Sequence, residues 1–346
     1  MFSQKVKNTD VTQIDNRDYL FDNIKALLIF LVVVGHITNL GYYHNDKLKT
    51  IYVFIYFFHM PAFIFISGYF SKNVDKCRET AVRNFLIPYI LMVLFYYVQI
   101  KMFPLPTQTN YMFRIFSPPT GCWYLFTMFI WKLFLKDLSK VRFCIPLLYA
   151  FGLLAGYSEE FGSKMNLGRL SVYTVFFMLG YFMNEKHVYY IRRVPKVVSV
   201  ALIYVLYRIS KYYVMVENIP IKLVMNKKDY RDNLLMDDLK FRFVYYIVAT
   251  VSILVLINLF TKRKTILSKI GRNTYTVYFF HLVVVRIIDL NFKDFVPFKE
   301  NTKLYFAFIL VAAAITTFVF SRDICIRLFT KFLDFVNRII FRKSTT

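Results

Sequence analysis

The sequence predicts an all-α integral membrane protein in which about ten transmembrane helices form one bundle. Three observations carry this prediction. Of the 346 residues, 57% are hydrophobic and 19% are charged, whereas average soluble domains are about 45–50% apolar and about 25% charged. Apolar runs long enough to cross a bilayer recur from one end of the chain to the other. Basic residues also gather in alternate loops, which is typical of membrane topology.

The apolar runs divide the chain into three parts. A polar N-terminal segment, residues 1–20, contains no apolar core, so no secretory signal peptide is expected. Residues 21–321 form a single transmembrane domain, and residues 322–346 predict a basic amphipathic helix on the membrane surface. A membrane-crossing helix needs about 20 mostly apolar residues. The candidate spans are 21–41, 50–71, 82–103, 120–136, 142–158, 167–184, 194–216, 241–261, 273–291 and 303–321.

The charges of the loops predict the orientation of the bundle. About 27 of the 45 Lys and Arg residues fall on the side that holds both termini, and about 18 fall on the other side. Loops rich in Lys and Arg stay in the cytoplasm, so both termini are expected there. The frequent use of Lys, Ile, Tyr, Phe and Asn indicates an AT-rich bacterial genome, hence a bacterial plasma membrane. The same rule accounts for most of the net charge of +24, so nucleic acid is not an expected partner.

Several common kinds of site are missing from the sequence. It contains no P-loop, no G-x-S-x-G elbow and no H-E-x-x-H motif. The cysteines lie far apart without the spacing of metal ligands, so free thiols and no metal site are expected. They are Cys77, Cys122, Cys144 and Cys325.

The first span carries a cation near one end and an imidazole near the other. Lys25 and His36 are eleven residues apart, which in an α-helix places them within ~20° on one face and ~16 Å apart along the axis. Ionisable groups inside a membrane are costly and are candidate functional residues. Neutral imidazole is the commonest general base. A histidine satisfied by a neighbouring helix and a lysine that snorkels to the interface remain the structural alternatives.

Two further histidines lie inside predicted spans. His59 precedes Pro61, which removes a backbone donor and frees a carbonyl group inside the bundle. Taken alone, His59 is explained equally well as a structural residue. His281 lies in the middle of its span, with Arg286 about a turn and a half away. This pair favours a hydrated cavity over lipid.

Charged residues at the cytoplasmic mouth are candidate ligands for an anionic phosphate compound. Asp22 begins the first span, where it either caps the helix dipole or orients Lys25 or Arg83. Arg78 and Arg83 precede the third span, where they are either ordinary cytoplasmic charges or phosphate ligands. Trp123 lies at the outer start of the fourth span, where an interfacial aromatic residue is expected.

Taken in order, these motifs resemble the acyltransferase-3 family of bacterial membrane enzymes that O-acylate surface carbohydrates. The likeness is greatest to the fucose 4-O-acetylase-like and related polysaccharide acetyltransferases. It covers nearly the whole chain. The segments that carry it are RDYLFDNIKALLIFLVVVGH (17–36), FFHMPAFIFISGYF (57–70), a basic turn into NFLIPY (84–89), CWYLFTMFIW (122–131) and NTYTVYFFHLVVV (273–285).

The resemblance implies a ten-helix fold and an acyl transfer across the membrane. An acetyl or other short acyl group would pass from cytoplasmic acyl-CoA, above all acetyl-CoA, to a hydroxyl of an extracytoplasmic cell-surface glycan or glycolipid. The family's basic residue, ten intervening positions and histidine match Lys25 and His36, although many members carry Arg in place of Lys25. The family's R-x-x-R pair is not reproduced, because Arg78 and Arg83 are five residues apart.

The resemblance also distributes roles over the candidate residues. His36 would be the catalytic residue, with His59 or His281 as its positioning group or as a second proton acceptor. Arg83 carries over from the family pattern more directly than Arg78 does. The donor side would comprise Lys25, Arg83, Arg78 and Asp22, and the acceptor side Arg286 and Trp123.

Two other classes of function remain open. Buried histidines and a charged cavity also suit a transporter or flippase for a surface polysaccharide or its precursor, although no internal repeat is found. A structural partner in a cell-envelope synthesis complex is the third class. The sequence does not decide between a homo-oligomer and such a complex, nor does it identify the acceptor glycan or the acyl group.

Overall fold

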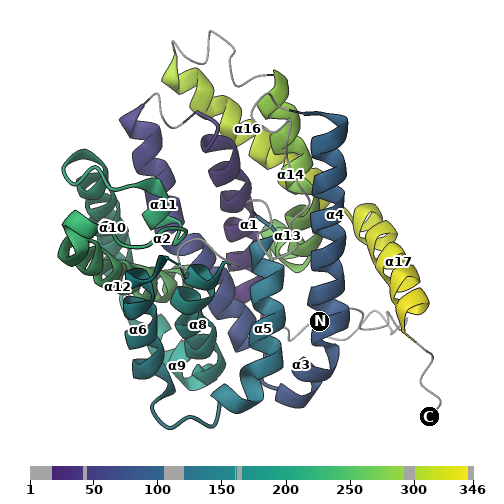
Figure 1. The fold of residues 1–346 in the computed structure, drawn as a ribbon, viewed down its shortest axis with the longest axis horizontal. Coiled ribbons are helices and arrows are strands. Elements are labelled where there is room, and N and C mark those ends of the chain that lie inside the picture. Colours follow the sequence, from purple (N-terminus) through teal and green to yellow (C-terminus); the bar gives the residue numbers. More distant parts are fainter. Residues whose placement is uncertain are drawn as a thin grey trace.

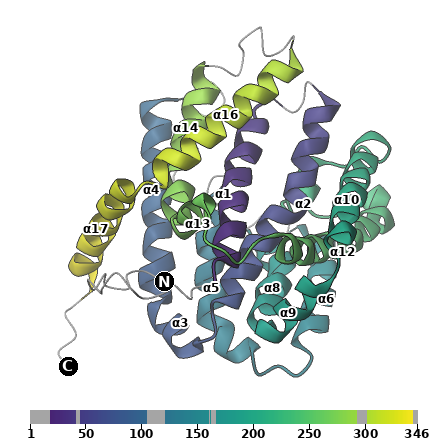
Figure 2. The same cartoon turned by 180° about the vertical axis from the view of Figure 1, so that it is seen from behind.

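The computed structural model describes residues 18–41, 45–104, 121–159, 161, 166–291 and 301–341. Within these ranges every regular element is helical, so the predicted all-α class is confirmed (Figures 1 and 2). The helices are α1 (Leu20–Thr38), α2 (Asp46–Tyr69), α3 (Val74–Ala81), η2 (Val82–Leu86), α4 (Ile87–Met102), α5 (Trp123–Leu138), α6 (Cys144–Leu154), η4 (Ala155–Tyr157), α8 (Leu167–Phe182), α9 (Glu185–Arg193), α10 (Lys196–Met215), α11 (Ile221–Val224), η5 (Asp232–Leu234), α12 (Leu235–Leu259), α13 (Ile266–Arg272), α14 (Thr274–Asn291), α16 (Thr302–Phe320) and α17 (Asp323–Ile340).

Each interval expected to span the membrane holds one α-helix, with the π-helical turn η2 before α4 and the 3-10 turn η4 after α6. Six helical stretches of the described chain are long and apolar enough to cross a bilayer. The count of ten spans and the cytoplasmic placement of both termini stay predictions. The six stretches are Leu20–Thr38, Asp46–Tyr69, Val74–Met102, Lys196–Met215, Asp232–Leu259 and Thr302–Phe320.

Helix α1 occupies the interior of the bundle, in contact with α2, α12, α13, α14 and α16. It is apolar on nearly every side, and a helix of that kind is stable only when it is surrounded by other helices or lipid. Its first turn is fixed by Asn23, whose side-chain amide donates to the carbonyls of Thr261 and Arg263. The amide oxygen of Asn23 accepts from the hydroxyls of Thr265 and Ser268. The buried polar group is therefore fully used, and it ties α1 to the chain before α13.

The closest approach of α2 to α8 depends on two glycines. A Cβ atom on Gly68 would lie 1.9 Å from the carbonyl oxygen of Phe177, and one on Gly180 would lie 1.9 Å from that of Phe65. Small residues allow such contacts between helices in membranes. Helix α2 carries His59, and α8 faces α2. The contact between the two helices therefore helps to position the site described below.

The C-terminal helix α17 lies beside α4 (Figures 1 and 2). It is amphipathic, as the sequence predicts, and packs Phe329 against Tyr275, Phe279 and Phe280. Leu333 is also buried, six other large apolar side chains of α17 are exposed, and its place at the membrane surface stays a prediction. Residues 342–346 of the tail and 1–17 of the N-terminal segment lie outside the described residues. The exposed apolar residues are Ile324, Leu328, Phe332, Phe335, Ile339 and Ile340.

We expect Gly180→Ala to destabilise the protein by about 1–3 kcal/mol or more, because the new methyl group meets backbone that cannot turn aside. Thermal unfolding of the detergent-solubilised protein would measure this loss. Gly35→Ala is the matched control: its added Cβ would meet only the ring of Tyr56, at 3.0 Å, and a side chain can move. Equal unfolding temperatures for the two variants would contradict the assigned importance of the α2–α8 contact.

Candidate active site

Two adjoining cavities follow one face of α1. The residues of α1 that line them are Lys25, Ile29, Val32 and His36. Their spacing of four, three and four residues keeps them on one side of a helix. Lys25 and His36 thus share a face, as their separation in the sequence predicts, and they lie at the two ends of the lined stretch.

The first cavity, called here the large cavity, has a volume of about 460 Å³ and is enclosed by α1, α2, α3, α5 and α14 together with η2. The charged residues among those described as lining it are all cations, namely Lys25, Lys76 and Lys132. The remaining walls are mostly apolar and aromatic, including Phe63 and Met128. A pocket of this size and character suits a small molecule that carries negative charge at one end.

The second cavity, called here the histidine cavity, is about 30 Å³ and is lined by His36, His59, Trp123 and residues around them. Such a volume holds about one or two water molecules. Val32, Met60 and Tyr278 line both cavities. The histidine cavity therefore begins where the large cavity ends.

His281 lies beside His36, with 5.0 Å between their ring centroids. The Nδ1 of His281 is 2.8 Å from the carbonyl oxygen of Tyr278 and 3.2 Å from that of Val277. A carbonyl can only accept, so Nδ1 carries the proton and Nε2 presents a lone pair. This Nε2 is buried without a hydrogen-bond partner in the described part of the chain. An unused acceptor next to another imidazole is suited to proton transfer.

His59 belongs to the same cavity, and it is held by its own helix. Its Nδ1 lies 2.7 Å from the carbonyl oxygen of Ile55 and donates to it. Its ring meets that of Tyr56 edge-on, with 4.7 Å between centroids. By the same reasoning as for His281, the Nε2 of His59 is the nitrogen left to accept a proton.

Arg169, on α8, is a site residue that the sequence analysis missed. Only 3% of it is exposed, and its guanidinium lies 4.7 Å from the centre of the Trp123 ring. Trp123 in turn stacks on Tyr173, and Nε of Arg169 donates to the carbonyl of Met225 at 3.1 Å. An arginine three residues inside the predicted span 167–184 is the signal that could have found it, because such charges are costly in a membrane.

Lys132 is a second residue that the sequence analysis did not single out. Lys132 lies at the end of a predicted span and the start of a basic loop, where the positive-inside rule already explains a cytoplasmic charge. In the structure Lys132 is buried at the large cavity, where its ammonium donates to Ser71 Oγ and to Cys77 Sγ. The charge of the loop alone does not predict that Lys132 is buried.

Several predicted site residues lie apart from both cavities. Asp22 is buried and forms an ion pair with Lys25 at 2.9 Å. Arg83, in the π-helical turn η2, stacks its guanidinium 4.9 Å from the ring of Phe341, and Arg78 is exposed on α3. Arg286 is buried and donates to the carbonyl of Phe103. Neither these three arginines nor Asp22 are among the described residues that line the two cavities, and their roles stay predictions.

Comparison with known proteins now identifies the family. The model of the acyltransferase domain matches residues 18–322, nearly the whole chain. The chain belongs to the acyltransferase-3 family. This confirms the resemblance and the predicted class of enzyme, an acyltransferase. No solved structure matches this chain.

Two curated relatives match parts of the chain. The nodulation protein NolL of Sinorhizobium fredii is 41% identical over 83 residues, which cover 21% of this chain and 23% of the relative. The protein of the same name from Mesorhizobium japonicum is 30% identical over 133 residues, which cover 35% of each. The chain thus matches about a quarter to a third of the length of these relatives.

Proposed function

We propose that this protein is a membrane O-acyltransferase that moves an acetyl or other short acyl group from cytoplasmic acyl-CoA to a hydroxyl of an extracytoplasmic cell-surface glycan. The observation that carries the proposal is the pair of cavities along α1, which meet at Val32, Met60 and Tyr278. One cavity presents cations, and the other presents imidazoles. A transfer between two substrates that arrive from opposite ends needs this arrangement.

The large cavity suits the donor. Its three lysines face a space without a lining acid in the described chain, and ammonium groups bind the phosphates of a nucleotide well. The apolar walls beyond them suit the pantetheine arm. Lys25 and His36 are ~16 Å apart along an ideal helix, so an extended arm anchored near Lys25 brings its thioester close to His36.

His36 is suited to activate the acceptor hydroxyl. As general base it takes the hydroxyl proton while the oxygen attacks the thioester carbonyl, and the carbon–sulfur bond breaks. The departing CoA thiolate takes that proton from the His36 imidazolium, which restores the base. His281 Nε2 can accept the other ring proton of His36 and so fix its tautomer. A route through acyl-histidine fits the same geometry.

The histidine cavity is too small for a sugar as it stands, so substrate entry requires side chains to move. Met60 and Met225 line it, and methionine is the most adaptable apolar side chain. Met60 faces both cavities, and Met225 belongs to the short segment before η5. Met60 and Met225 can change conformation and widen the cavity without moving the rings around His36.

We expect His36→Ala to lower acyl transfer by at least about a hundredfold, the contribution of a well-placed general base. Transfer of labelled acetyl from acetyl-CoA to surface glycans of membrane vesicles measures it, with the membrane level followed by immunoblot. His187→Ala is the control, since His187 only caps α9. Full transfer by His36→Ala at a normal membrane level would remove His36 from the mechanism.

We expect His281→Leu to lower kcat about tenfold to a hundredfold while the KM values for donor and acceptor stay within about twofold, because His281 touches His36 and not a binding wall. Phe280→Leu, at the next position of α14, packs against Phe320 and Phe329 and serves as the control. A raised KM with an unchanged kcat would assign His281 to substrate binding instead.

Two partly exposed cysteines allow a test of donor binding without any substitution. Cys77 lines the large cavity, whereas Cys325 lies on α17. We expect acetyl-CoA, whose sulfur is acylated and does not react with maleimide, to slow maleimide labelling of Cys77 severalfold and to leave Cys325 unaffected, as judged by mass spectrometry of the labelled peptides. Equal labelling of Cys77 with and without saturating acetyl-CoA would argue for a transporter rather than a CoA-dependent enzyme.

A further inference from the structure

A third cavity lies at the end of α2 opposite the large cavity. It measures about 410 Å³ and is lined by the first turn of α2 and by residues 218–222 and Lys228. We call it the lysine cavity because Lys49, Lys222 and Lys228 line it, together with one acid, Asp46. Three cations against one carboxylate give this cavity a positive potential, which concentrates anions.

One short segment, residues 218–228, separates the lysine cavity from the histidine cavity. Its ends line the lysine cavity, and Met225, between them, lines the histidine cavity. Arg169 donates to the carbonyl of Met225, which joins this segment to α8. A ligand in the lysine cavity is therefore one layer of chain away from His36.

A buried cation, Arg169, continues this positive path toward His36. Arg169 is 3% exposed, and no ion pair joins it to an acid within the described chain. A buried guanidinium is costly without an anionic partner. A negatively charged ligand would supply one.

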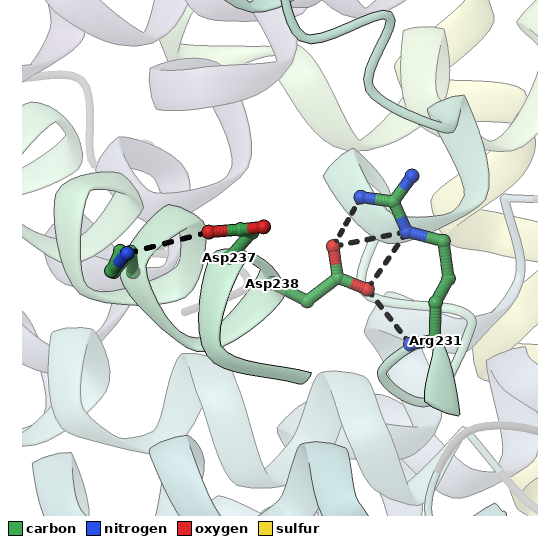
Figure 3. Close-up of polar contacts among 4 residues, drawn as sticks. Arg231, Asp237 and Asp238 are labelled. Atoms are coloured by element: carbon green, nitrogen blue, oxygen red, sulfur yellow. Dashed lines mark hydrogen bonds and ion pairs between the residues drawn. The ribbon is translucent and has the colours of Figure 1, made fainter. Parts of the chain in front are cut away.

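The neighbouring Arg231 shows that this region does pair cations where no ligand is involved. Both its side chain and its backbone N–H donate to the buried carboxylate of Asp238, with a closest approach of 2.6 Å (Figure 3). Lys222 and Lys228 form no ion pair in the described chain. These two lysines are instead exposed at the lysine cavity, where they can meet a ligand from solution.

We propose that the acceptor is an anionic glycan, whose carboxylate or phosphate group is bound in the lysine cavity while a nearby hydroxyl reaches His36. This inference rests on the proposed acyl transfer and names the chemical class of its acceptor. Lys222 and Lys228 hold the anion, and Arg169 extends the positive field inward. Asp46 restricts the anion to the lysine side of the cavity.

The test is a binding measurement on the full chain in phosphatidylcholine nanodiscs. The probes are an end-labelled galacturonate oligomer, its carboxyl-reduced neutral counterpart and a phosphate-bearing glycan oligomer, followed by fluorescence anisotropy. At least one anionic probe is expected to bind about tenfold more tightly than the neutral one, with a preference that weakens as salt rises. The better anionic probe identifies the carboxylate or the phosphate. Equal binding of all three probes, or none, overturns the proposal.

Substitutions then place the anion. The double variant Lys222→Gln, Lys228→Gln is expected to weaken binding of the preferred anionic probe about tenfold and to leave the neutral probe and the protection of Cys77 by acetyl-CoA unchanged. The double variant Lys222→Arg, Lys228→Arg retains binding. Lys240→Gln, which removes one exposed charge paired with Asp237 outside the cavity, is the matched control. A loss as large in Lys240→Gln as in the double Gln variant overturns the assignment to the lysine cavity.

These outcomes differ from those that would defeat the proposed function. Charge-selective binding without acetyl transfer would remove the acyltransferase proposal and keep the anionic ligand. Acetyl transfer to glycans without charge-selective binding would keep the acyltransferase proposal and remove the anionic acceptor.

Discussion

The fixed position of α1 is the constraint on which the site depends. This helix is surrounded by five others, and a fully used amide at Asn23 ties its first turn to the chain before α13. In a bilayer the helices gain little from hydrophobic association, so polar bonds and close packing have to specify their positions. With α1 held, Lys25 and His36 can line two different cavities from one helix face.

Four cations of the bundle fall into two groups. Lys25 and Arg231 each have an acid, Asp22 and Asp238, that neutralises part of the cost of burial. Lys132 and Arg169 have only neutral donors, acceptors and aromatic faces around them in the described chain. Lys132 lines the large cavity and Arg169 lines the histidine cavity, while Lys25 of the first group also lines the large cavity. A cation without an acid at each cavity suits the two anionic substrates that we propose.

The candidate site could be predicted in part from local spacing. The alignment of Lys25 with His36 needs only helical geometry, and the costs of charge in a membrane single out His59 and His281. The contact between His281 and His36 could not be foreseen, since 245 residues separate them. Arg169 and Lys132 were missed because residues near the ends of spans have a general explanation as interfacial charges. Arg78, Arg83 and Arg286 were chosen from the sequence as charges in or beside a span, but they lie outside the two cavities.

The sequence by itself determined the class of the protein and the places of its helices, because apolar length and helical periodicity are local properties of the chain. It also determined the family, since the ordered motifs cover nearly the whole chain. Only the tertiary structure decided which polar groups meet. Helix packing brings α1, α2, α5, α8 and α14 around His36, and residues 218–228 between two cavities. That arrangement depends on contacts such as Gly68 with Phe177 and Asn23 with Thr261, whose partners lie far away in the sequence.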